Sequence, residues 1–467
     1  MTYAEFINKK SSQIPESGFV VGPTAINPML FDFQRDIACW ALRKGKAAIF
    51  ADCGLGKTLM QLEWAHKIHA HTGMDMLIVA PLSVTNQTKG EGEKFNIPVT
   101  ICRKQSDVKS GINITNYEMV HHFDINHFVG IVLDESSIIK SFSGATRNYL
   151  IGACVDIPYK LACTATPAPN DHMELGNHAE FLGIMSRTEM LSTFFVHDSG
   201  ETQKWRLKGH AEDKFWEWVA SWAVVVKNPN DMGYHQEGYD LPPLEIKEHI
   251  VRLENEHIEE SGQISLLPVL AKTLNDRRAA RRNSMQERVS LAAEIANGID
   301  EQFIIWCDLN AEGEALSKAV MGAVEVAGRH TDEHKINAMN SFLNGNTRVI
   351  VSKPSIFGFG INMQNCHNMI YVGLSDSWEQ FYQSLRRCYR FGQKNKVNVH
   401  VIISEQEGSV LENIKRKQSQ ADEMIKQMAQ RTKNLFLDDI KQTQRISESY
   451  HAHDVIKLPS FLKGAVQ

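Results

Sequence analysis

The stretch Ala47–Thr58, AAIFADCGLGKT, decides the fold. Its apolar first half is typical of a buried parallel strand, and a helical pattern begins at its end. The two glycines between strand and helix allow consecutive backbone N–H groups to face one anion. The lysine then reaches the β- and γ-phosphates of a nucleotide, and the threonine hydroxyl can bind Mg²⁺. The phosphate-loop pattern has glycine where this chain has Ala51, so an ordinary strand, glycine turn and helix is the alternative. The residues expected to bind the nucleotide here are Gly54, Leu55, Gly56, Lys57 and Thr58.

A carboxylate pair, Asp134 and Glu135, follows the apolar run 129–133. The carboxyl ends of parallel strands are where an α/β sheet places its chemistry. We expect Asp134 to hold Mg²⁺, directly or through water, and Glu135 to polarise the attacking water. An acidic pair at a helix start is the alternative, but the upstream phosphate loop favours the catalytic interpretation.

Apolar runs alternate with helical patterns along most of the chain. This alternation predicts parallel sheets, and therefore an α/β fold with a nucleotide-binding first half and a second half that lacks its own phosphate loop. The expected strands are 76–80, 112–115 and 161–165 in the first half, and 302–306, 324–326, 347–352, 369–372 and 397–403 in the second.

Polar side chains in both halves could complete a nucleotide site. Gln34 lies about one turn into the helical pattern 30–42, and its amide offers the donor and acceptor that an adenine edge requires, although a glutamine on a helix is commonly just solvated. In the second half, Arg387 and Arg390 are spaced i, i+3 on one expected helical face. Their planar forks suit a triphosphate held by another domain, and they would supply transition-state charge. A surface salt-bridge helix is the alternative.

Two segments between the halves allow more than one interpretation. Four tryptophans lie in one segment, where Phe215, Trp218, Val219 and Trp222 share one helical face. This pattern indicates the core of a small helical insertion, or alternatively an aromatic wedge that stacks on a base. A basic stretch over 266–296 indicates a solvated helix face, or alternatively a phosphate-contacting patch. The residues concerned are Trp205, Trp216, Trp218 and Trp222, and Lys272, Arg277, Arg278, Arg281, Arg282 and Arg288.

Composition gives no support for a generally basic, disulfide-stabilised, zinc-binding or membrane-spanning protein. The net charge of −5 gives no general support for nucleic-acid binding, so any such site must be a local surface. The eight cysteines are dispersed without a C-x-x-C pair, which favours neither a zinc site nor a disulfide framework. No apolar run approaches the roughly 18 residues of a membrane span, and the first residues lack an apolar signal core. We expect a cytoplasmic protein.

The ordered motifs resemble those of superfamily-2 helicases, which are related to the DEAD/DEAH-box ATPases, and specifically their Swi/Snf-type DNA translocases. The family commonly has alanine at the position of Ala51. Ser136-Ser137 replaces its usual Ala-His, which removes one link between motifs II and III. The chain lacks large accessory modules and looks like the minimal motor of bacteria and phages. The matching segments are FDFQ (31–34), ADCGLGKT (51–58), LIVAPLSV (77–84), ITNYEMV (114–120), VLDESSIIK (132–140), TATP (164–167), RHTDEHKINAMNSF (329–342), GFGINMQNCHNMIYV (358–372) and QSLRRCYRFGQ (383–393).

The resemblance implies two RecA-like domains with ATP and Mg²⁺ in the cleft between them, acting on duplex DNA as a monomer. Partner proteins from replication, recombination or restriction are conceivable. The alternatives are a strand-separating DNA or RNA helicase and, from another class, an ATP-gated DNA clamp with little turnover. The resemblance adds Gly360 and Gln383 as ATP-binding candidates, and its candidate nucleic-acid contacts are Ser83, Asn116, Thr164 and Asn362.

The expected organisation has six segments. These are a lead-in (1–29), the first RecA-like domain (30–170), a helical aromatic-rich insertion and linker (171–250), a basic helical segment (251–300), the second RecA-like domain (301–432) and a flexible tail (433–467).

Overall fold

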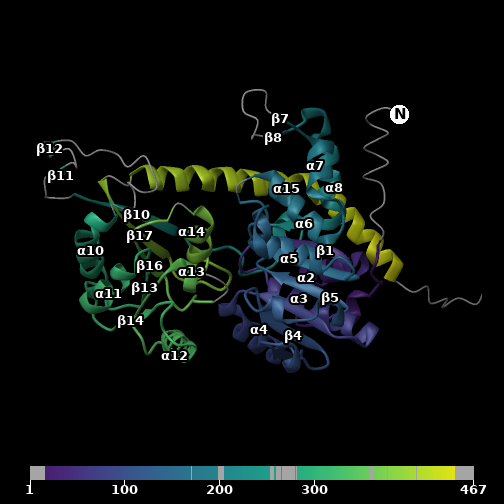
Figure 1. Ribbon diagram of the computed structural model, residues 1–467, viewed down its shortest axis with the longest axis horizontal. Coiled ribbons are helices and arrows are strands. Elements are labelled where there is room, and N and C mark those ends of the chain that lie inside the picture. Colours follow the sequence, from purple (N-terminus) through teal and green to yellow (C-terminus); the bar gives the residue numbers. More distant parts are fainter. Residues whose placement is uncertain are drawn as a thin grey trace, which may run out of the picture.

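The computed structural model describes residues 16–447 except 170, 198–204, 253–256, 259–263, 266–278, 280, 358–361, 376 and 406–407. Two α/β lobes lie side by side, and one long helix, α15 (Gly408–Ser447), spans both of them (Figure 1). The expected α/β class with two parallel sheets is confirmed. Within the described residues, no helix combines the length and apolar character needed to cross a membrane.

The first sheet has seven parallel strands in the order β3-β4-β2-β5-β6-β1-β9. Its central strands are buried on both faces because helices cover each side, which explains their continuous apolar runs. The strands are β1 (Lys46–Ala51), β2 (Met76–Ala80), β3 (Val99–Ile101), β4 (Ile112–Asn116), β5 (Gly130–Asp134), β6 (Tyr159–Thr164) and β9 (Ala223–Val226).

Helices and short turns surround this sheet. The α-helices are α2 (Asp32–Lys44), α3 (Lys57–Thr72), α4 (Leu82–Lys94), α5 (Ala145–Ala153), α6 (Leu175–Leu182), α7 (Arg187–Phe194) and α8 (Glu212–Trp222). Short 3-10 helices cover Pro23–Ala25, Gln105–Asp107, Val120–His122, Ile125–His127, Ser136–Lys140, His172–Glu174, Gly209–Ala211 and Pro229–Met232. A small antiparallel pair is formed by β7 (Phe195–His197) and β8 (Trp205–Leu207).

The second sheet has six parallel strands in the order β10-β17-β16-β13-β15-β14. They are β10 (Leu244–Val251), β13 (Phe303–Cys307), β14 (Ala323–Val326), β15 (Val349–Ser352), β16 (Asn368–Val372) and β17 (Val397–Ser404). Its helices are α10 (Met285–Asn297), α11 (Asn310–Ala319), α12 (Asp332–Leu343), α13 (Pro354–Phe357) and α14 (Trp378–Leu385), and a two-residue pair joins β11 (His257–Ile258) to β12 (Ile264–Ser265).

The segment expected to be an insertion and linker belongs partly to the two sheets. β9 pairs with β1 at the edge of the first sheet, and β10 pairs with β17 at the edge of the second. Trp216, Trp218 and Trp222 are buried in the same hydrophobic core as Phe50 of β1. The tryptophans therefore form a core, and the wedge interpretation loses its support.

Two arginines of the basic stretch differ from both of its interpretations, whereas Arg282 is exposed, as a solvated face requires. Arg281 pairs with Asp308, and Arg288 lies 2.7 Å from Glu312 with both side chains completely buried. These arginines anchor α10 inside the second lobe, so they form neither a solvated face nor a phosphate patch. Lys272, Arg277 and Arg278 lie outside the described residues.

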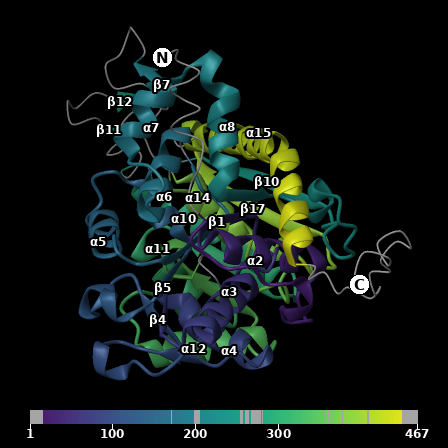
Figure 2. The same ribbon diagram turned by 90° about the vertical axis from the view of Figure 1, so that its right-hand side faces the viewer.

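The tail expected to be flexible beyond 432 continues as α15 to Ser447. Along this helix, Ile414 and Ala421 pack into the core of the second lobe, whereas Met428 and Phe436 pack into the cores of the first. Its far end lies beside α2 (Figure 2), where Asp439 accepts a hydrogen bond from the Trp40 indole at 2.8 Å. One continuous helix thus joins the two lobes.

Candidate nucleotide and nucleic-acid site

The phosphate loop turns sharply between β1 and α3. Gly54 and Gly56 have φ angles of 90° and 78°, which only glycine adopts readily. A Cβ on Gly56 would lie 2.3 Å from the Gln34 Nε2 atom, so a side chain does not fit there. The Lys57 ammonium donates to the carbonyls of Ala51 at 2.8 Å and Asp52 at 3.3 Å. Lys57 and Thr58 form the first turn of α3, as the sequence predicts.

Gln34 lies beside the phosphate loop, as expected, but its amide is already used within the chain. Its oxygen accepts from the Phe31 backbone N–H at 2.9 Å, which caps α2. Its Nε2 donates to the Leu55 carbonyl at 2.9 Å. Gln34 therefore ties the start of α2 to the phosphate loop, and a role in reading adenine remains a prediction.

Asp134 and Glu135 lie at the end of β5. The Gln61 amide of α3 donates to the Asp134 carboxylate at 2.8 Å, which places this carboxylate against the helix that begins at Lys57. Burial raises the pKa of Asp134, while the Gln61 hydrogen bond and the charge of Lys57 oppose that rise. Burial likewise raises the pKa of Glu135, and Lys57 and Arg387 lower it. Glu135 has a left-handed backbone, with φ 52°.

The TATP segment contacts Glu135 from β6. The Thr164 hydroxyl donates to the Glu135 carboxylate at 3.4 Å and accepts from the Thr166 backbone N–H at 3.1 Å. Thr164 is completely buried. Its expected contact with nucleic acid is therefore corrected, because a buried hydroxyl with these partners supports Glu135 instead.

The second lobe reaches the phosphate loop through α14 and the turns that follow it. α14 ends at Leu385, so Arg387 and Arg390 lie in these turns and not on one helical face as expected. A Cβ on Gly54 would lie 3.6 Å from the Arg390 Cβ atom, which shows how closely Arg390 packs on the loop. Burial and the charge of Arg387 lower the pKa of Arg390 to about 10. Both arginines thus lie at the interface of the lobes.

The strongest contact between α14 and the phosphate loop was missed by sequence reasoning. The Asp52 carboxylate accepts from Arg386 Nη2 at 2.7 Å and from the Tyr382 hydroxyl at 2.5 Å. Arg386 also donates to the Cys53 carbonyl at 3.2 Å. The adjacent arginines 386 and 387 are a signal for such a contact, but the expected helical register pointed to Arg387 and Arg390.

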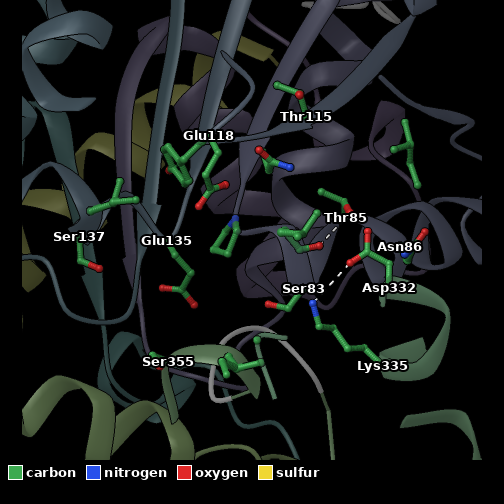
Figure 3. Close-up of a pocket in the computed structure, with 18 of the residues that line it drawn as sticks. Ser83, Thr85, Asn86, Thr115, Glu118, Glu135, Ser137, Asp332, Lys335 and Ser355 are labelled. Carbon is green, nitrogen blue, oxygen red and sulfur yellow. Dashed lines mark hydrogen bonds and ion pairs between the residues drawn. The ribbon is translucent and has the colours of Figure 1, made fainter. Parts of the chain in front are cut away.

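A cavity of about 640 Å³ opens between the lobes next to Glu135. Ser83 and Asn116 line it from the first lobe, and Asp332 and Lys335 of α12 line it from the second. Figure 3 shows the Glu135 carboxylate pointing into this cavity, with Lys335 paired to Asp332 on another wall. The structure therefore brings two of the four expected nucleic-acid contacts together at one interdomain cavity.

The remaining candidates are more scattered. Asn362 does not line the cavity; its side-chain oxygen accepts from the Gln364 backbone N–H at 3.4 Å. Gln383 is completely buried on α14, and its Nε2 donates to Glu379 at 3.5 Å. The Gln383 Oε1 atom has no hydrogen-bond partner in the part of the chain that is described. Gly360 lies outside the described residues.

The fold and the site together define a two-domain P-loop α/β protein whose second domain brings arginines to the phosphate loop. Residues 287–392 match the family model described as the helicase conserved C-terminal domain. This match begins within α10 and ends at Gly392, one residue before the end of the QSLRRCYRFGQ segment. The second lobe is therefore similar to the helicase conserved C-terminal domain.

Curated relatives extend the similarity to most of the chain. DNA annealing helicase and endonuclease ZRANB3 of Mus musculus is 19% identical over 424 residues, which cover 82% of this chain. The Bos taurus protein of the same name is 21% identical over 439 residues. This chain spans 39% of the length of each relative. These matches support the resemblance to superfamily-2 helicases that the motifs indicate.

A solved structure is also similar. The SWI2/SNF2 ATPase core of Sulfolobus solfataricus in complex with double-stranded DNA has 18% sequence identity and a TM-score of 0.41, covering 90% of this chain and 99% of that one.

Proposed function

We propose that this chain is an ATP-dependent motor that couples hydrolysis between its two lobes to movement along duplex DNA. The observation that carries the proposal is the meeting of both lobes at the phosphate loop, where Arg390 packs on Gly54 and Arg386 binds Asp52. A site assembled from two lobes can change their relative position when its ligand changes. The helicase C-terminal domain in the second lobe and the named DNA helicases among the relatives support DNA as the substrate.

The chemistry of the site fits ATP with Mg²⁺. The Thr58 hydroxyl and the Asp134 carboxylate are hard oxygen donors, which suit this cation, and bound Mg²⁺ would neutralise phosphate charge. In the described part of the chain, no group of three or more His, Cys, Asp or Glu side chains could hold an ion by itself.

Each residue of the interdomain site has its own role in the proposed hydrolysis. Backbone N–H groups of the loop and Lys57 would bind the phosphates, and Asp134 would hold the Mg²⁺ ion. Glu135 positions the attacking water, since its carboxylate is held by Thr164 and points into the interdomain space (Figure 3). Arg387 and Arg390 supply positive charge as it is needed in the transition state.

Nucleic acid is expected along the cavity that Ser83, Asn116 and Lys335 line. The polar side chains and the lysine suit phosphate oxygens, which are the main contacts of proteins that follow a backbone without reading its sequence. Because the cavity also contains Glu135, a ligand there would lie next to the hydrolytic site. This adjacency supports stimulation of hydrolysis by nucleic acid.

Triplex displacement tests the proposal. A duplex translocase contacts phosphates without opening base pairs, so the protein with ATP should release the third strand of a triplex and leave a plain forked duplex intact. A strand-separating helicase must offset roughly 1.4 kcal/mol of stacking per base-pair step. Efficient unwinding of the fork would overturn the choice of duplex translocation. ATP-dependent DNA retention with negligible turnover would instead show a clamp.

A further inference from the structure

The carboxylate of Glu379, a residue of the second lobe, contacts two residues of the first lobe. Glu379 lies in the first turn of α14 and is only 8% exposed. Its Oε1 atom accepts from the Thr166 hydroxyl at 3.1 Å, and its Oε2 atom forms an ion pair with Lys140. Both partners belong to the first lobe, so one side chain of α14 holds two separate segments of the other lobe.

The segments that contain Thr166 and Lys140 are both close to Glu135, the expected hydrolytic carboxylate. Thr166 follows β6, and its backbone N–H donates to the Thr164 hydroxyl, which donates in turn to Glu135. Lys140 ends the 3-10 helix that begins after Glu135, and its carbonyl accepts from the Asn177 amide at 2.7 Å. Buried hydrogen bonds of 3.1 to 3.4 Å therefore connect Glu135 to Glu379 through Thr164 and Thr166.

The other end of α14 is fixed to the phosphate loop. Tyr382 and Arg386 bind Asp52, while the Arg387 guanidinium donates to the Gln383 carbonyl at 2.8 Å. Together with Glu379, these contacts attach α14 to the first lobe on both sides of the nucleotide site. A displacement of either attachment moves the helix and the arginines that follow it.

Within the described residues, no hydrogen bond or ion pair joins segment 136–140 directly to Thr166. The Ser136 hydroxyl contacts the His178 Nε2 atom at 3.1 Å, so this polar side chain is directed to α6 within the first lobe. Lys140 and Thr166 instead share the Glu379 carboxylate. The second lobe therefore supplies a second connection between these two segments, in addition to the buried path through Thr164 and Glu135.

We propose that Glu379 is a positioning residue that couples the state of Glu135 to the movement of α14, with Thr166 as its partner. This inference rests on the proposed motor function. Loss of the Glu379 contacts leaves the ATP-binding residues in place but removes the path by which hydrolysis shifts the second lobe. Movement per ATP should then fall more than ATP affinity does.

The test compares Glu379→Ala, Thr166→Val and the double variant in the full chain, with Glu217→Ala as the matched control. Glu217 forms an exposed pair with Lys214 on α8, away from the interface of the lobes. KM for ATP, duplex-stimulated kcat and triplex strands displaced per ATP are measured for each. We expect displacement per ATP to fall on the order of tenfold in each single variant, within the usual range of coupling between sites. KM should change little, and the control should match the unmodified chain.

The double variant distinguishes coupling from separate structural damage. If the two residues act as one link, the double variant loses no more than either single variant. Additive losses, or a KM effect with normal displacement per ATP, would overturn the inference. The exchange of charges in Lys140→Glu with Glu379→Lys should restore part of the loss caused by Lys140→Glu alone, and its failure to do so would also count against the link. An unmodified chain without duplex-stimulated turnover would instead overturn the proposed function itself.

Discussion

Asp52 of the phosphate loop and Arg386 of the second lobe form an ion pair with 2.7 Å between Oδ2 and Nη2. Both side chains are largely buried, at 12% and 11% exposure. Asp52 directly follows β1 and Arg386 directly follows α14, so the pair joins the loop that leads to Lys57 to the turns that contain Arg387 and Arg390. Buried pairs of this kind cost several kcal/mol to break on one side, because one charge is left unpaired.

The first prediction concerns this pair. Arg386→Ala should lower kcat/KM for ATP on the order of tenfold, because the remaining Asp52 carboxylate lies next to the site of the phosphates. The matched control is Arg35→Ala, which removes an exposed pair with Asp32 on α2 and should have no effect. Steady-state ATPase kinetics of the two variants measure the difference. Equal kinetics in the two variants would show that the Asp52–Arg386 contact does not contribute.

Glu135→Gln should separate binding from chemistry. The substitution keeps the size of the side chain but removes the carboxylate that positions water, so turnover should fall on the order of 10² or more while ATP affinity is retained. Nucleotide binding by fluorescence titration and single-turnover hydrolysis measure the two effects. A kcat close to normal would mean that Glu135 has been given the wrong role.

Arg390→Ala should lower kcat far more than ATP affinity, because its contact with the triphosphate becomes strongest in the transition state. An effect on the order of 10³ is typical of an arginine that serves this purpose. Arg416→Ala on the exposed face of α15 is the control. Unchanged kcat together with weaker ATP binding would contradict a transition-state role.

His178 makes stability depend on pH. Burial lowers the pKa of His178 from its usual 6.5 to about 4. Between these values the unfolded chain binds the proton and the folded chain does not, so stability falls as pH falls from about 6.5 to 4, on the order of 3 kcal/mol in all. His178→Gln should flatten this part of the profile in chemical denaturation. An identical slope in the variant would contradict the assignment.

Trp216→Ala should lower stability and leave coupling intact. Its ring is buried among Phe215 and the core of the first lobe, and truncation of a buried aromatic costs roughly 3–5 kcal/mol. Thermal unfolding measures the loss. The ratio of triplex displacement to ATP hydrolysis, measured below the unfolding transition, should remain that of the unmodified chain. A folded variant that loses this ratio would restore the wedge interpretation.

Much of the fold follows from local patterns. The strand β1, the turn at Gly54 and Gly56 and the helix α3 could be predicted because apolar continuity, glycine and helical periodicity occur in immediate succession. β10 was missed because it lies at the edge of its sheet, where Ile246 and Ile250 are exposed and the strand has no buried apolar run. Its place depends on pairing with β17, which is distant in sequence.

Sequence patterns predict the site residues within one lobe, but not the contacts between the lobes. Lys57, Asp134 and Glu135 follow from strands whose ends carry their own signals. The contacts that join the two lobes do not follow from local signals. They depend on where α14 ends and on how it packs against the first lobe. Glu379 and Arg386 are seven residues apart on the sequence yet bind different segments of the first lobe. Nothing local to either residue identifies its partner.

We propose that duplex DNA drives hydrolysis at the interdomain site. The most direct test of this proposal is the steady-state ATPase rate of the full chain without nucleic acid and with single-stranded DNA, duplex DNA or RNA, with Glu135→Gln as the inactive reference. We expect the rate to be highest with duplex DNA and to be abolished by Glu135→Gln in every condition. A rate that single strands or RNA stimulate more than duplex, or that no nucleic acid changes, would contradict it.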